Sequence, residues 1–444
     1  MTRVSIDFSK ELGAVKPMHA VNNGPLAPTV RGTSNFELYK AARIPYARNH
    51  DASLYTGYGG EHVVDVHRIF KNFDADENDP ASYTFEPTDK YVRVTYEADT
   101  KVFYRLGASI EHQYKYGTKV PKDMAKWARI CEHIIRHYNE GWANGFEYGI
   151  EYWEIWNEPD CRNADGSNPC WQGTEDEFIE FYCIVAKHLK SCFPNLKIGG
   201  PAFVSPWLKK DIRTKFLKTV KENNIPLDFY SFHRYSKTPQ ELAKSADFGK
   251  QALSEFGIEG VETILNEWNY VKGWLADEWK YTLDVEQGLK GASFIAGTMA
   301  LCQYTSIDML MYYDARPSAM NGMFDLKKPY IPLKGYYPFV MFSNLYDLDA
   351  AVETIGTDEI LAVSAKSNDK KAIMLTYYLD EDEAPNSEVA IELKALGEGR
   401  KTVDFYLVDE ENDMRLVKTE YLSADEATLY LNMSLFSTYY IEIR

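Results

Sequence analysis

The fold is decided by one stretch near the middle of the chain, Tyr152-Trp-Glu-Ile-Trp-Asn-Glu-Pro-Asp160. Branched and aromatic residues dominate this stretch, and such residues favour a pleated strand. Pro159 cannot donate a hydrogen bond to a strand ladder, so the strand must end just before it. The stretch therefore predicts a short apolar strand that places the carboxylate of Glu158 at its C-terminal end.

A second run further along the chain has the same form. It is Glu262-Thr-Ile-Leu-Asn-Glu-Trp-Asn269, which is again apolar and again closes on Asn-Glu. Glu267 is therefore predicted to stand at a strand end in the same way as Glu158. Two carboxylates in equivalent positions suggest that both belong to one site.

Strand-like and helix-like runs alternate through the first three quarters of the chain. Eight apolar runs have strand character, at 18–21, 44–49, 101–106, 152–156, 197–200, 228–233, 263–266 and 307–312. Amphipathic runs with apolar residues three and four positions apart lie between them, at 35–42, 122–140, 174–191, 206–223, 239–256 and 285–304. Such repetition implies a parallel sheet covered by helices, and eight units close into a (β/α)8 TIM barrel.

The segment from 50 to 101 is too long for a simple connection between strands. It contains an acidic run at 72–80 and a helix-like run at 88–98. Long insertions in compact domains are usually functional. We expect this segment to form part of the rim around the site.

The pattern changes after a helix-like run at 334–348. Short alternating segments then follow between clusters of Asn, Asp, Gly and Glu, at 362–365, 371–378, 388–393, 402–407, 427–432 and 439–443. This pattern is typical of an antiparallel β-sandwich. Residues 3–9 also read as a strand, which is expected to join that sheet. The predicted organisation is an N-terminal strand in 1–15, a catalytic barrel in 16–348 and an accessory β-sandwich in 349–444.

Composition and charge limit the classes of partner. The chain has 444 residues and a formal net charge of -17, whereas nucleic-acid binding draws its affinity from clustered Lys and Arg. No run approaches the roughly 20 apolar residues of a membrane span, and the first eight residues lack the apolar core of a signal peptide. We therefore expect no nucleic-acid or membrane partner, and a cytoplasmic protein unless a leader has been removed. The tyrosine-rich composition is compatible with a homo-oligomer.

The cysteines fall into two groups. Cys161 and Cys170 bracket a turn-rich segment and could close a small loop as a disulfide. Thiols of intracellular proteins usually stay reduced, so the sequence leaves both states open. The other four lie in helical patterns and are predicted to be buried thiols: Cys131, Cys183, Cys192 and Cys302.

The positions of the two acids predict a chemistry. Glu158 ends the fourth strand and Glu267 the seventh, and the C-terminal ends of barrel strands meet on one face. Two carboxylates roughly 5–5.5 Å apart across a pocket support glycoside hydrolysis with retained configuration. Glu158, beside Trp156, would be the acid, with a pKa raised by burial. Glu267 would be the nucleophile, kept ionised by donors such as Arg48 and Tyr235.

Several motifs around these acids carry a family resemblance. They are Ile155-Trp-Asn-Glu-Pro159, Trp171-Gln-Gly-Thr174, Lys197-Ile-Gly-Gly-Pro201, Asn266-Glu-Trp-Asn269, Arg48-Asn-His50, Asp228-Phe-Tyr-Ser-Phe-His-Arg-Tyr235 and Lys328-Pro-Tyr330. Together they resemble glycoside hydrolase family 39, which comprises β-xylosidases and α-L-iduronidases built on a barrel with an accessory β-sandwich. The resemblance covers nearly the whole chain.

The resemblance implies roles for individual residues. Glu158 would be the acid/base, Glu267 the nucleophile, and Asn157 would bind the sugar 2-hydroxyl. The residues expected to line the sugar site are His50, His233 and Tyr235, and Arg48, Trp268 and Tyr312 complete the predicted substrate-binding set.

No cofactor and no metal are expected, because a pair of carboxylates hydrolyses glycosides unaided. His62, Asp65 and His67 cluster in the sequence, and His112 follows Glu111. Nothing in this cluster resembles the paired histidines on one helical face of a zinc hydrolase. Glu154 is interpreted as an interior partner rather than a catalytic acid.

The segments after the third and eighth strands, at 104–112 and 312–317, depart from the family pattern. Arg105 or Arg316 could pair with the carboxylate of a uronate, or instead with Glu111 or Asp314. The favoured function is a retaining exo-glycosidase that releases xylose from short oligosaccharides or glycosides. The alternatives are another retaining glycosidase of the same barrel type (β-glucosidase, β-galactosidase, arabinosidase or α-L-iduronidase) and, in a different class, a carbohydrate-binding protein with impaired catalysis.

Overall fold

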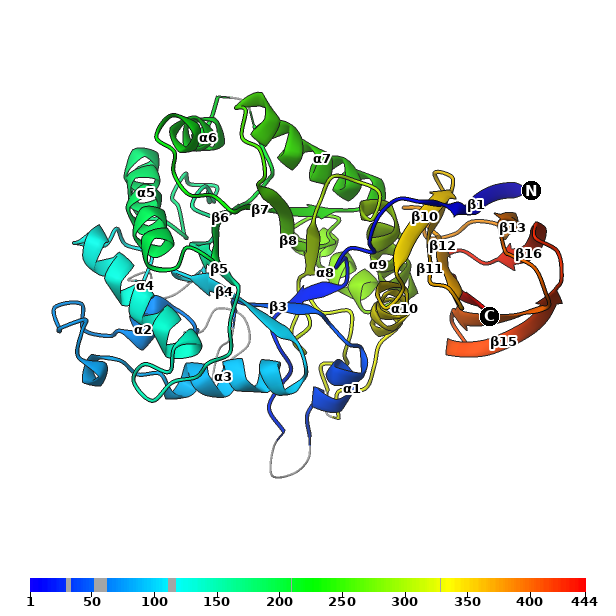
Figure 1. Cartoon of the computed structure of the whole chain (residues 1–444), viewed down its shortest axis with the longest axis horizontal. Helices are drawn as coiled ribbons and strands as arrows, with labels where there is room; N and C mark the ends of the chain where they lie inside the picture. Colours follow the sequence, from blue (N-terminus) through cyan, green and yellow to red (C-terminus); the bar gives the residue numbers. More distant parts are fainter. Residues whose placement is uncertain (29–32, 52–61, 111–116, 209, 328) are drawn as a thin grey trace.

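A computed structural model of the chain describes residues 1–28, 33–51, 62–110, 117–208, 210–327 and 329–444. Figure 1 shows a barrel wrapped by helices and, beside it, a unit made of strands that contains both the N-terminus and the C-terminus. Glu111, His112 and Lys328, which entered the sequence analysis, lie outside the described residues.

The barrel is closed by eight strands in chain order. They are β2 (Ala20–Asn22), β3 (Tyr46–Asn49), β4 (Lys101–Leu106), β5 (Tyr152–Ile155), β6 (Lys197–Phe203), β7 (Phe229–Ser236), β8 (Glu262–Tyr270) and β9 (Met309–Tyr312). Every neighbouring pair is parallel, including β9 with β2. The predicted (β/α)8 barrel and its eight strands are confirmed.

Helices surround the barrel, and each predicted helical run contains at least part of one, whereas the short helix at Val66–Ile69 was not predicted. The helices are α1 (Phe36–Ala41), α2 (Val66–Ile69), α3 (Glu86–Glu97), α4 (Met124–Asn139), α5 (Glu175–Cys192), α6 (Ile212–Glu222), α7 (Pro239–Glu255), α8 (Ala276–Glu286), α9 (Leu289–Cys302) and α10 (Tyr336–Tyr346), with a 3-10 turn at Pro80–Ser82. In the described part of the chain, no helix is both long and apolar enough to cross a membrane.

Two helices differ from the prediction for local reasons. The run at 206–223 becomes helical only at Ile212, because the side chain of Asp211 caps that helix by accepting a hydrogen bond from the backbone N–H of Arg213. The run at 285–304 is not one helix but the end of α8 and the whole of α9. Gly288 separates them, which fits the low helix propensity of glycine.

The barrel interior is built in two layers. The lower layer is apolar and contains Ala20, Phe103, Tyr152, Phe229, Ile264, Met309 and Met311. Residues two apart on a strand point to the same side, so the next inward positions form the layer above. This upper layer is polar and includes the buried residues Asn22, Arg48, Arg105, Glu154 and Ser231. The lower layer thus seals the barrel, and the upper one forms a polar floor below its C-terminal mouth.

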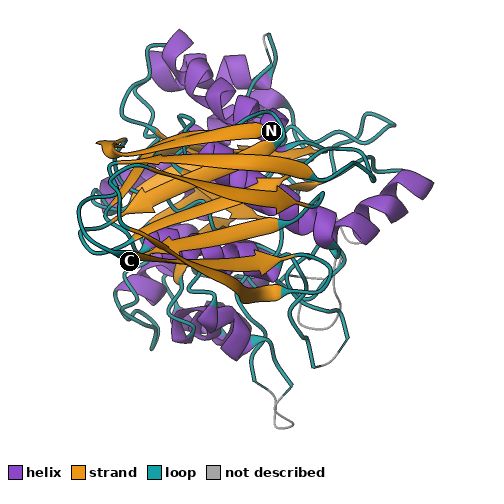
Figure 2. Cartoon of the chain, turned by 90° about the vertical axis from the view of Figure 1, so that its right-hand side faces the viewer, coloured by secondary structure: helices purple, strands orange, loops and turns teal. Residues whose placement is uncertain are grey.

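The remaining strands form a second sheet, seen face-on in Figure 2. Its order is β15-β14-β17-β12-β11-β10-β1-β13-β16. The strands are β1 (Thr2–Glu11), β10 (Ala350–Ile355), β11 (Ile360–Lys366), β12 (Lys371–Tyr377), β13 (Ser387–Lys394), β14 (Lys401–Val408), β15 (Asp413–Leu422), β16 (Ala427–Met433) and β17 (Thr438–Ile443). The N-terminal strand joins this sheet as predicted.

The strand pairs of the second sheet are antiparallel with one exception. β1 runs parallel to β13, although it is antiparallel to β10 on its other side. Two strands joined by a short hairpin must be antiparallel. The chain between β1 and β13 includes the whole barrel, so this pair can be parallel. The sheet encloses a core of its own, in which Val4 and Ile6 of β1 pack with residues of β12, β14 and β17.

The two units share a buried interface. Along β11, Ile360 and Ala362 belong to the core of the second sheet, whereas Leu361 and Val363 belong to the core of the barrel unit. This is the alternation expected of a strand that is covered on both faces. The opposite face of β11 and β12 meets α9, in which every residue except Leu301 is buried. The sheet is therefore firmly packed against the barrel.

Candidate active site

Glu158 stands just beyond β5, at the C-terminal mouth of the barrel. The chain turns sharply here, with positive φ angles at Trp156 (+78°) and Glu158 (+46°). The indole N–H of Trp156 donates to the backbone oxygen of Cys170 at 2.9 Å, which anchors that ring in the core. The turn directs the Glu158 side chain into a cavity of about 720 Å³.

Glu267 reaches the same cavity because β8 contains a bulge. Phe232 of β7 is aligned with Leu265, and the next residue, His233, is aligned with Glu267, so Asn266 is an extra residue. A bulge redirects the side chains around it. Asn266 and Glu267 consequently both face inward: the Asn266 amide donates to Glu154 at 2.6 Å, and Glu267 lines the cavity.

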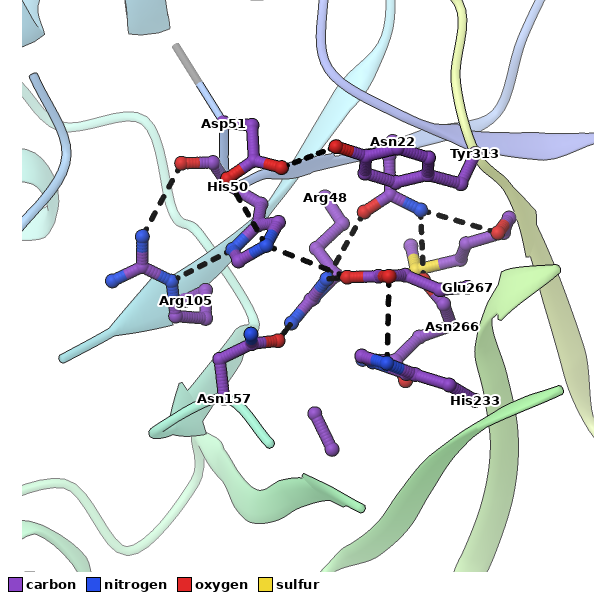
Figure 3. A network of polar contacts seen from close by, with 12 residues as sticks. Asn22, Arg48, His50, Asp51, Arg105, Asn157, His233, Asn266, Glu267 and Tyr313 are labelled. Carbon is purple, nitrogen blue, oxygen red and sulfur yellow. Dashed lines mark hydrogen bonds and ion pairs between the residues drawn. The ribbon is translucent and has the colours of Figure 1, made fainter. Parts of the chain in front are cut away.

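Arg48 lies beside Glu267 and is completely buried (Figure 3). Its guanidinium donates to Oε2 of Glu154, Oε1 of Glu267 and Oδ1 of Asn157, each at 2.7 Å. Burial opposes the charge, but the carboxylates of Glu154 and Glu267 raise the pKa of Arg48 above its ordinary value. Because Arg48 occupies the Asn157 oxygen, the amide N–H₂ of Asn157 is the group left to face the cavity.

Two neutral histidines border the acids. Arg105 donates from Nε to Nδ1 of His50 at 3.0 Å, so the ring proton of His50 must be on Nε2, which lies 3.4 Å from Oε1 of Glu267. His233 places Nδ1 2.7 Å from Oε1 of Glu158 and 3.4 Å from Oε2 of Glu267. Burial lowers the pKa of His50 well below its usual value and that of His233 to about 4.

The surroundings of the two carboxyls differ. Glu267 accepts hydrogen bonds from Arg48 and, at 2.9 Å, from the Tyr235 hydroxyl. Glu158 contacts His233, and the Cys170 thiol lies 4.0 Å from its Oε2. Burial raises the pKa of Glu158 to about 7, so a large fraction of this carboxyl still carries its proton near neutral pH.

Burial also affects Glu267, the carboxyl that the donors were predicted to keep ionised. It raises the pKa of Glu267 above the usual value. The positive charge of Arg48 opposes the shift without cancelling it. The donors lie where the sequence predicts them, and burial of the Glu267 carboxyl is the reason its pKa is raised.

The structure brings together most of the predicted site residues. Six line the cavity: His50, Asn157, Glu158, His233, Tyr235 and Glu267. Arg48, which was predicted to bind substrate, instead contacts Glu267 from below the cavity, with its side chain fully buried. Its contacts hold Glu267 and Asn157 in place.

Trp268 and Tyr312 are not at the cavity, and their predicted contact with sugar is contradicted. Both are fully buried, 5.3 Å apart between ring centres, and they pack on Phe294 of α9 and Phe339 of α10. The neighbour of an inward-facing residue on a strand points outward. Trp268 follows Glu267 and so faces the helices, and the same rule makes Tyr313, rather than Tyr312, the residue that lines the cavity.

Sequence reasoning missed several residues of the cavity wall. Asp51 follows His50 directly and accepts a hydrogen bond from the Tyr313 hydroxyl. Trp274 and Leu275 stand at the rim, 56% and 78% exposed. Strict strand alternation would have identified Tyr313. The loop positions of Trp274 and Leu275 carry no comparable signal.

The two arginines considered for a uronate are engaged elsewhere. Arg105 is fully buried and donates to Asp65 at 2.5 Å and to Ser109 at 2.6 Å. Arg316 donates from its side chain to the backbone oxygen of Asp51 at 2.5 Å.

Three groups in the described chain have the composition and closeness to hold a cation. They are Glu158 with His233 and Glu267, Glu158 with Cys161 and Cys170, and Glu132 with His188 and Cys192. Asp65, from the sequence cluster with His62 and His67, is bound to Arg105. Cys161 and Cys170 are both free thiols.

Comparison with known proteins identifies the family. A model of the glycosyl hydrolases family 39 matches residues 46–296, which is more than half of the chain. The chain belongs to this family. The matched region runs from β3 into α9 and includes both Glu158 and Glu267.

Relatives of this family 39 protein include two curated β-xylosidases. The one from Caldicellulosiruptor saccharolyticus is 25% identical over 255 residues, which cover 55% of this chain and 47% of the relative. The one from Geobacillus stearothermophilus is 30% identical over 184 residues, which cover 39% of this chain and 30% of the relative. The matches thus span less than half of each relative.

The fold is shared along the whole chain with solved structures. A glucosidase from Croceicoccus marinus aligns with a TM-score of 0.79 at 20% sequence identity, covering 100% of this chain and 99% of that one. This likeness supports the combination of barrel and second sheet.

Proposed function

We propose that this family 39 protein is a retaining exo-glycosidase, with xylose as the preferred terminal sugar. The observation that carries the proposal is the closeness of the two acids: one oxygen of Glu158 and one of Glu267 lie within 4.8 Å of each other. Retaining enzymes hold their carboxyl groups about 5–5.5 Å apart, whereas inverting enzymes leave about 6.5–9.5 Å for a water molecule. The separation here favours direct attack by a carboxylate.

The proposed reaction has two steps. Glu158 donates its proton to the leaving oxygen while Glu267 attacks the anomeric carbon, so the glycosidic bond breaks as a glycosyl ester forms. Esterification removes the negative charge of Glu267 and thereby lowers the pKa of Glu158. Glu158 then takes a proton from water, and the resulting hydroxide displaces Glu267. Each residue ends in its starting protonation state.

The cavity supports recognition of a neutral sugar. Asn157 offers an amide N–H₂, and Asp51 offers a carboxylate whose Oδ1 lies 3.2 Å from Nε2 of His50 at the cavity wall. A carboxylate accepts hydrogen bonds from sugar hydroxyls but repels the carboxylate of a uronate. Arg105, one of two candidates to neutralise such a group, is fully buried and bound to Asp65. These contacts argue against the α-L-iduronidase alternative, and the curated relatives point to xylose.

The test is hydrolysis of a panel of 4-nitrophenyl glycosides. The panel contains β-xyloside, β-glucoside, β-galactoside, both α-L-arabinosides and an α-L-iduronide. Wild type is compared with Glu267→Ala, Glu158→Gln and the control Glu180→Gln, which alters an exposed carboxylate on α5.

We expect turnover of the β-xyloside that is lost in Glu267→Ala and unchanged in Glu180→Gln. Preferred turnover of another neutral glycoside would be consistent with the mechanism but would contradict xylose as the preferred sugar. Activity retained by Glu267→Ala would overturn the mechanism, and inactivity on the whole panel would favour a binding role.

A further inference from the structure

Two cysteines that play no part in the proposed reaction lie beside the proposed acid. The Cys170 Sγ is 4.0 Å from Oε2 of Glu158. The two sulfur atoms and a carboxylate oxygen of Glu158 all lie within 4.8 Å of one another. Cys161 lines the active-site cavity, and Cys170 is fully buried behind it.

The loop that carries these thiols is fixed at its base. The side-chain oxygen of Asn168 accepts hydrogen bonds from the backbone N–H of Cys170 at 2.8 Å and of Trp171 at 2.9 Å, and its amide donates to the oxygen of Pro159 at 2.6 Å. At the other end, the N–H of Cys161 donates to the backbone oxygen of Glu158 at 3.0 Å. Both sulfur atoms are thereby held next to the Glu158 carboxyl.

We propose that Glu158, Cys161 and Cys170 form an inhibitory binding site for a thiophilic divalent cation, with Zn²⁺ as the representative ion. The inhibition rests on the proposed role of Glu158, whereas binding of the ion does not. Thiolates select soft or borderline cations, and a carboxylate is an acceptable third ligand for zinc.

The arrangement of ligand atoms is close to that of a zinc site. Zinc lies about 2.3 Å from sulfur and about 2.0–2.2 Å from carboxylate oxygen in tetrahedral sites, which places ligand atoms roughly 3.5–3.8 Å apart. Separations within 4.8 Å require only a small contraction. Since Cys161 borders the cavity, the fourth position of the metal would open toward solvent in the cavity.

Binding of the ion would block the first step of hydrolysis. The two thiols and the Glu158 carboxyl each release one proton to solvent as the cation binds, so the acid has no proton to give to the leaving group. His233 contacts the other oxygen, Oε1, and is not displaced. A chelator that removes the cation restores the thiols and the acid.

The first experiment is a Zn²⁺ titration of the whole protein in a phosphine reductant, with hydrolysis of its best chromogenic substrate as the readout. We expect inhibition that is reversed by a chelator. Cys161→Ser should weaken the apparent zinc affinity by at least about tenfold, the lower end of what loss of even an outer-shell partner costs. The matched control is Cys192→Ser, which disrupts the separate group of Glu132, His188 and Cys192. Zn²⁺ should inhibit this variant as strongly as it inhibits wild type.

A second readout is independent of catalysis. Cd²⁺ bound to thiolates gives an ultraviolet charge-transfer band, which should appear in wild type and in Glu158→Gln, and should weaken in Cys161→Ser and in Cys170→Ser. Basal turnover with no zinc effect, or equal inhibition of wild type and Cys161→Ser, would overturn the zinc site and leave the glycosidase proposal intact. Cation binding by the thiolates without turnover of any glycoside would support the zinc site and contradict the glycosidase proposal.

Discussion

The two acids at the barrel mouth differ in the groups that contact them. Glu267 is held by a permanent cation and a phenol, Arg48 and Tyr235, whereas Glu158 meets the neutral ring of His233. Donors stabilise the ionised form of a carboxyl, and burial without a cation stabilises the protonated form. This asymmetry supports the proposed roles of Glu267 as nucleophile and Glu158 as acid.

The pH profile should report this asymmetry. Burial raises the pKa of Glu158 to about 7, so the fraction that carries the required proton falls as the pH rises through 7. We expect kcat/KM, measured with chelator present, to decline above about pH 7. The Glu158→Gln variant, assayed on a substrate with an activated leaving group, should lose this basic limb. An unchanged basic limb in that variant would assign the titration to another group.

Asp51 provides a test of sugar recognition. A hydrogen bond to a charged group contributes about 1.5–3 kcal/mol, so Asp51→Asn should lower kcat/KM on the preferred neutral glycoside by roughly 10–150-fold. Tyr313→Phe removes only the hydroxyl that donates to Asp51 and should have a smaller effect. Steady-state kinetics on both variants checks this expectation. Equal activity of Asp51→Asn and wild type would remove Asp51 from the sugar site.

Among the elements, β3, β5 and β8 contribute three connected residues to the polar floor that supports the site. Arg48, Glu154 and Asn266 are completely buried and joined by hydrogen bonds. Ser231 of β7 adds a further donor to Glu154 at 2.6 Å. Removing one partner from such a network leaves an uncompensated charge in the interior.

The stability of variants should show the cost of breaking this floor. Glu154→Ala should lower the free energy of unfolding by about 3–5 kcal/mol, because Arg48 would remain buried without one of its partners. The control is Glu151→Ala on the approach to the same strand, where the carboxylate lies 3.3 Å from Lys197 at the surface and should contribute less than about 1 kcal/mol. Denaturant unfolding of both variants measures the difference. Equal losses would contradict the proposed role of the floor.

The elements also show which features a sequence pattern can predict. Each barrel strand has its own apolar run, and all eight were found. Strand β15 was missed because most of its residues are exposed, so it lacks an apolar face. The inward turn of Asn266 and Glu267 depends on a bulge that no local pattern marks. Trp268 and Tyr312 were misplaced because each neighbours an inward-facing residue on its strand and therefore faces the helices. The acids were predictable because they end strands; their pKa values depend on burial that only the fold determines.

In the molecule as a whole, the N-terminal and C-terminal segments belong to the same sheet. Strand β1 lies inside the second sheet, between β10 and β13, and that sheet packs on α9 of the barrel. We propose that residues 1–15 and 349–444 form one accessory unit that stabilises the barrel through α9. Loss of this unit should therefore affect activity as well as stability, although it is separate from the cavity.

Substitutions in β1 test that coupling. Ile6 is fully buried in the second core, and Ile6→Ala should cost about 2–5 kcal/mol. Its neighbour Ser5 points the other way and is only partly buried, so Ser5→Ala should change stability by less than about 0.5 kcal/mol. Thermal unfolding should show activity and secondary structure lost together at a lowered Tm in Ile6→Ala. Activity that survives unfolding of the sheet would show that the barrel is independent.

In the proposed mechanism, Glu267 attacks the sugar directly while Glu158 supplies the proton. The most direct measurement is the anomeric configuration of the first product, followed by proton NMR during hydrolysis of whichever glycoside turns over fastest. Two carboxylates this close predict that the released sugar first appears with the same configuration as the substrate and only later equilibrates. A first product of inverted configuration would require a water molecule between the acids and would contradict the mechanism.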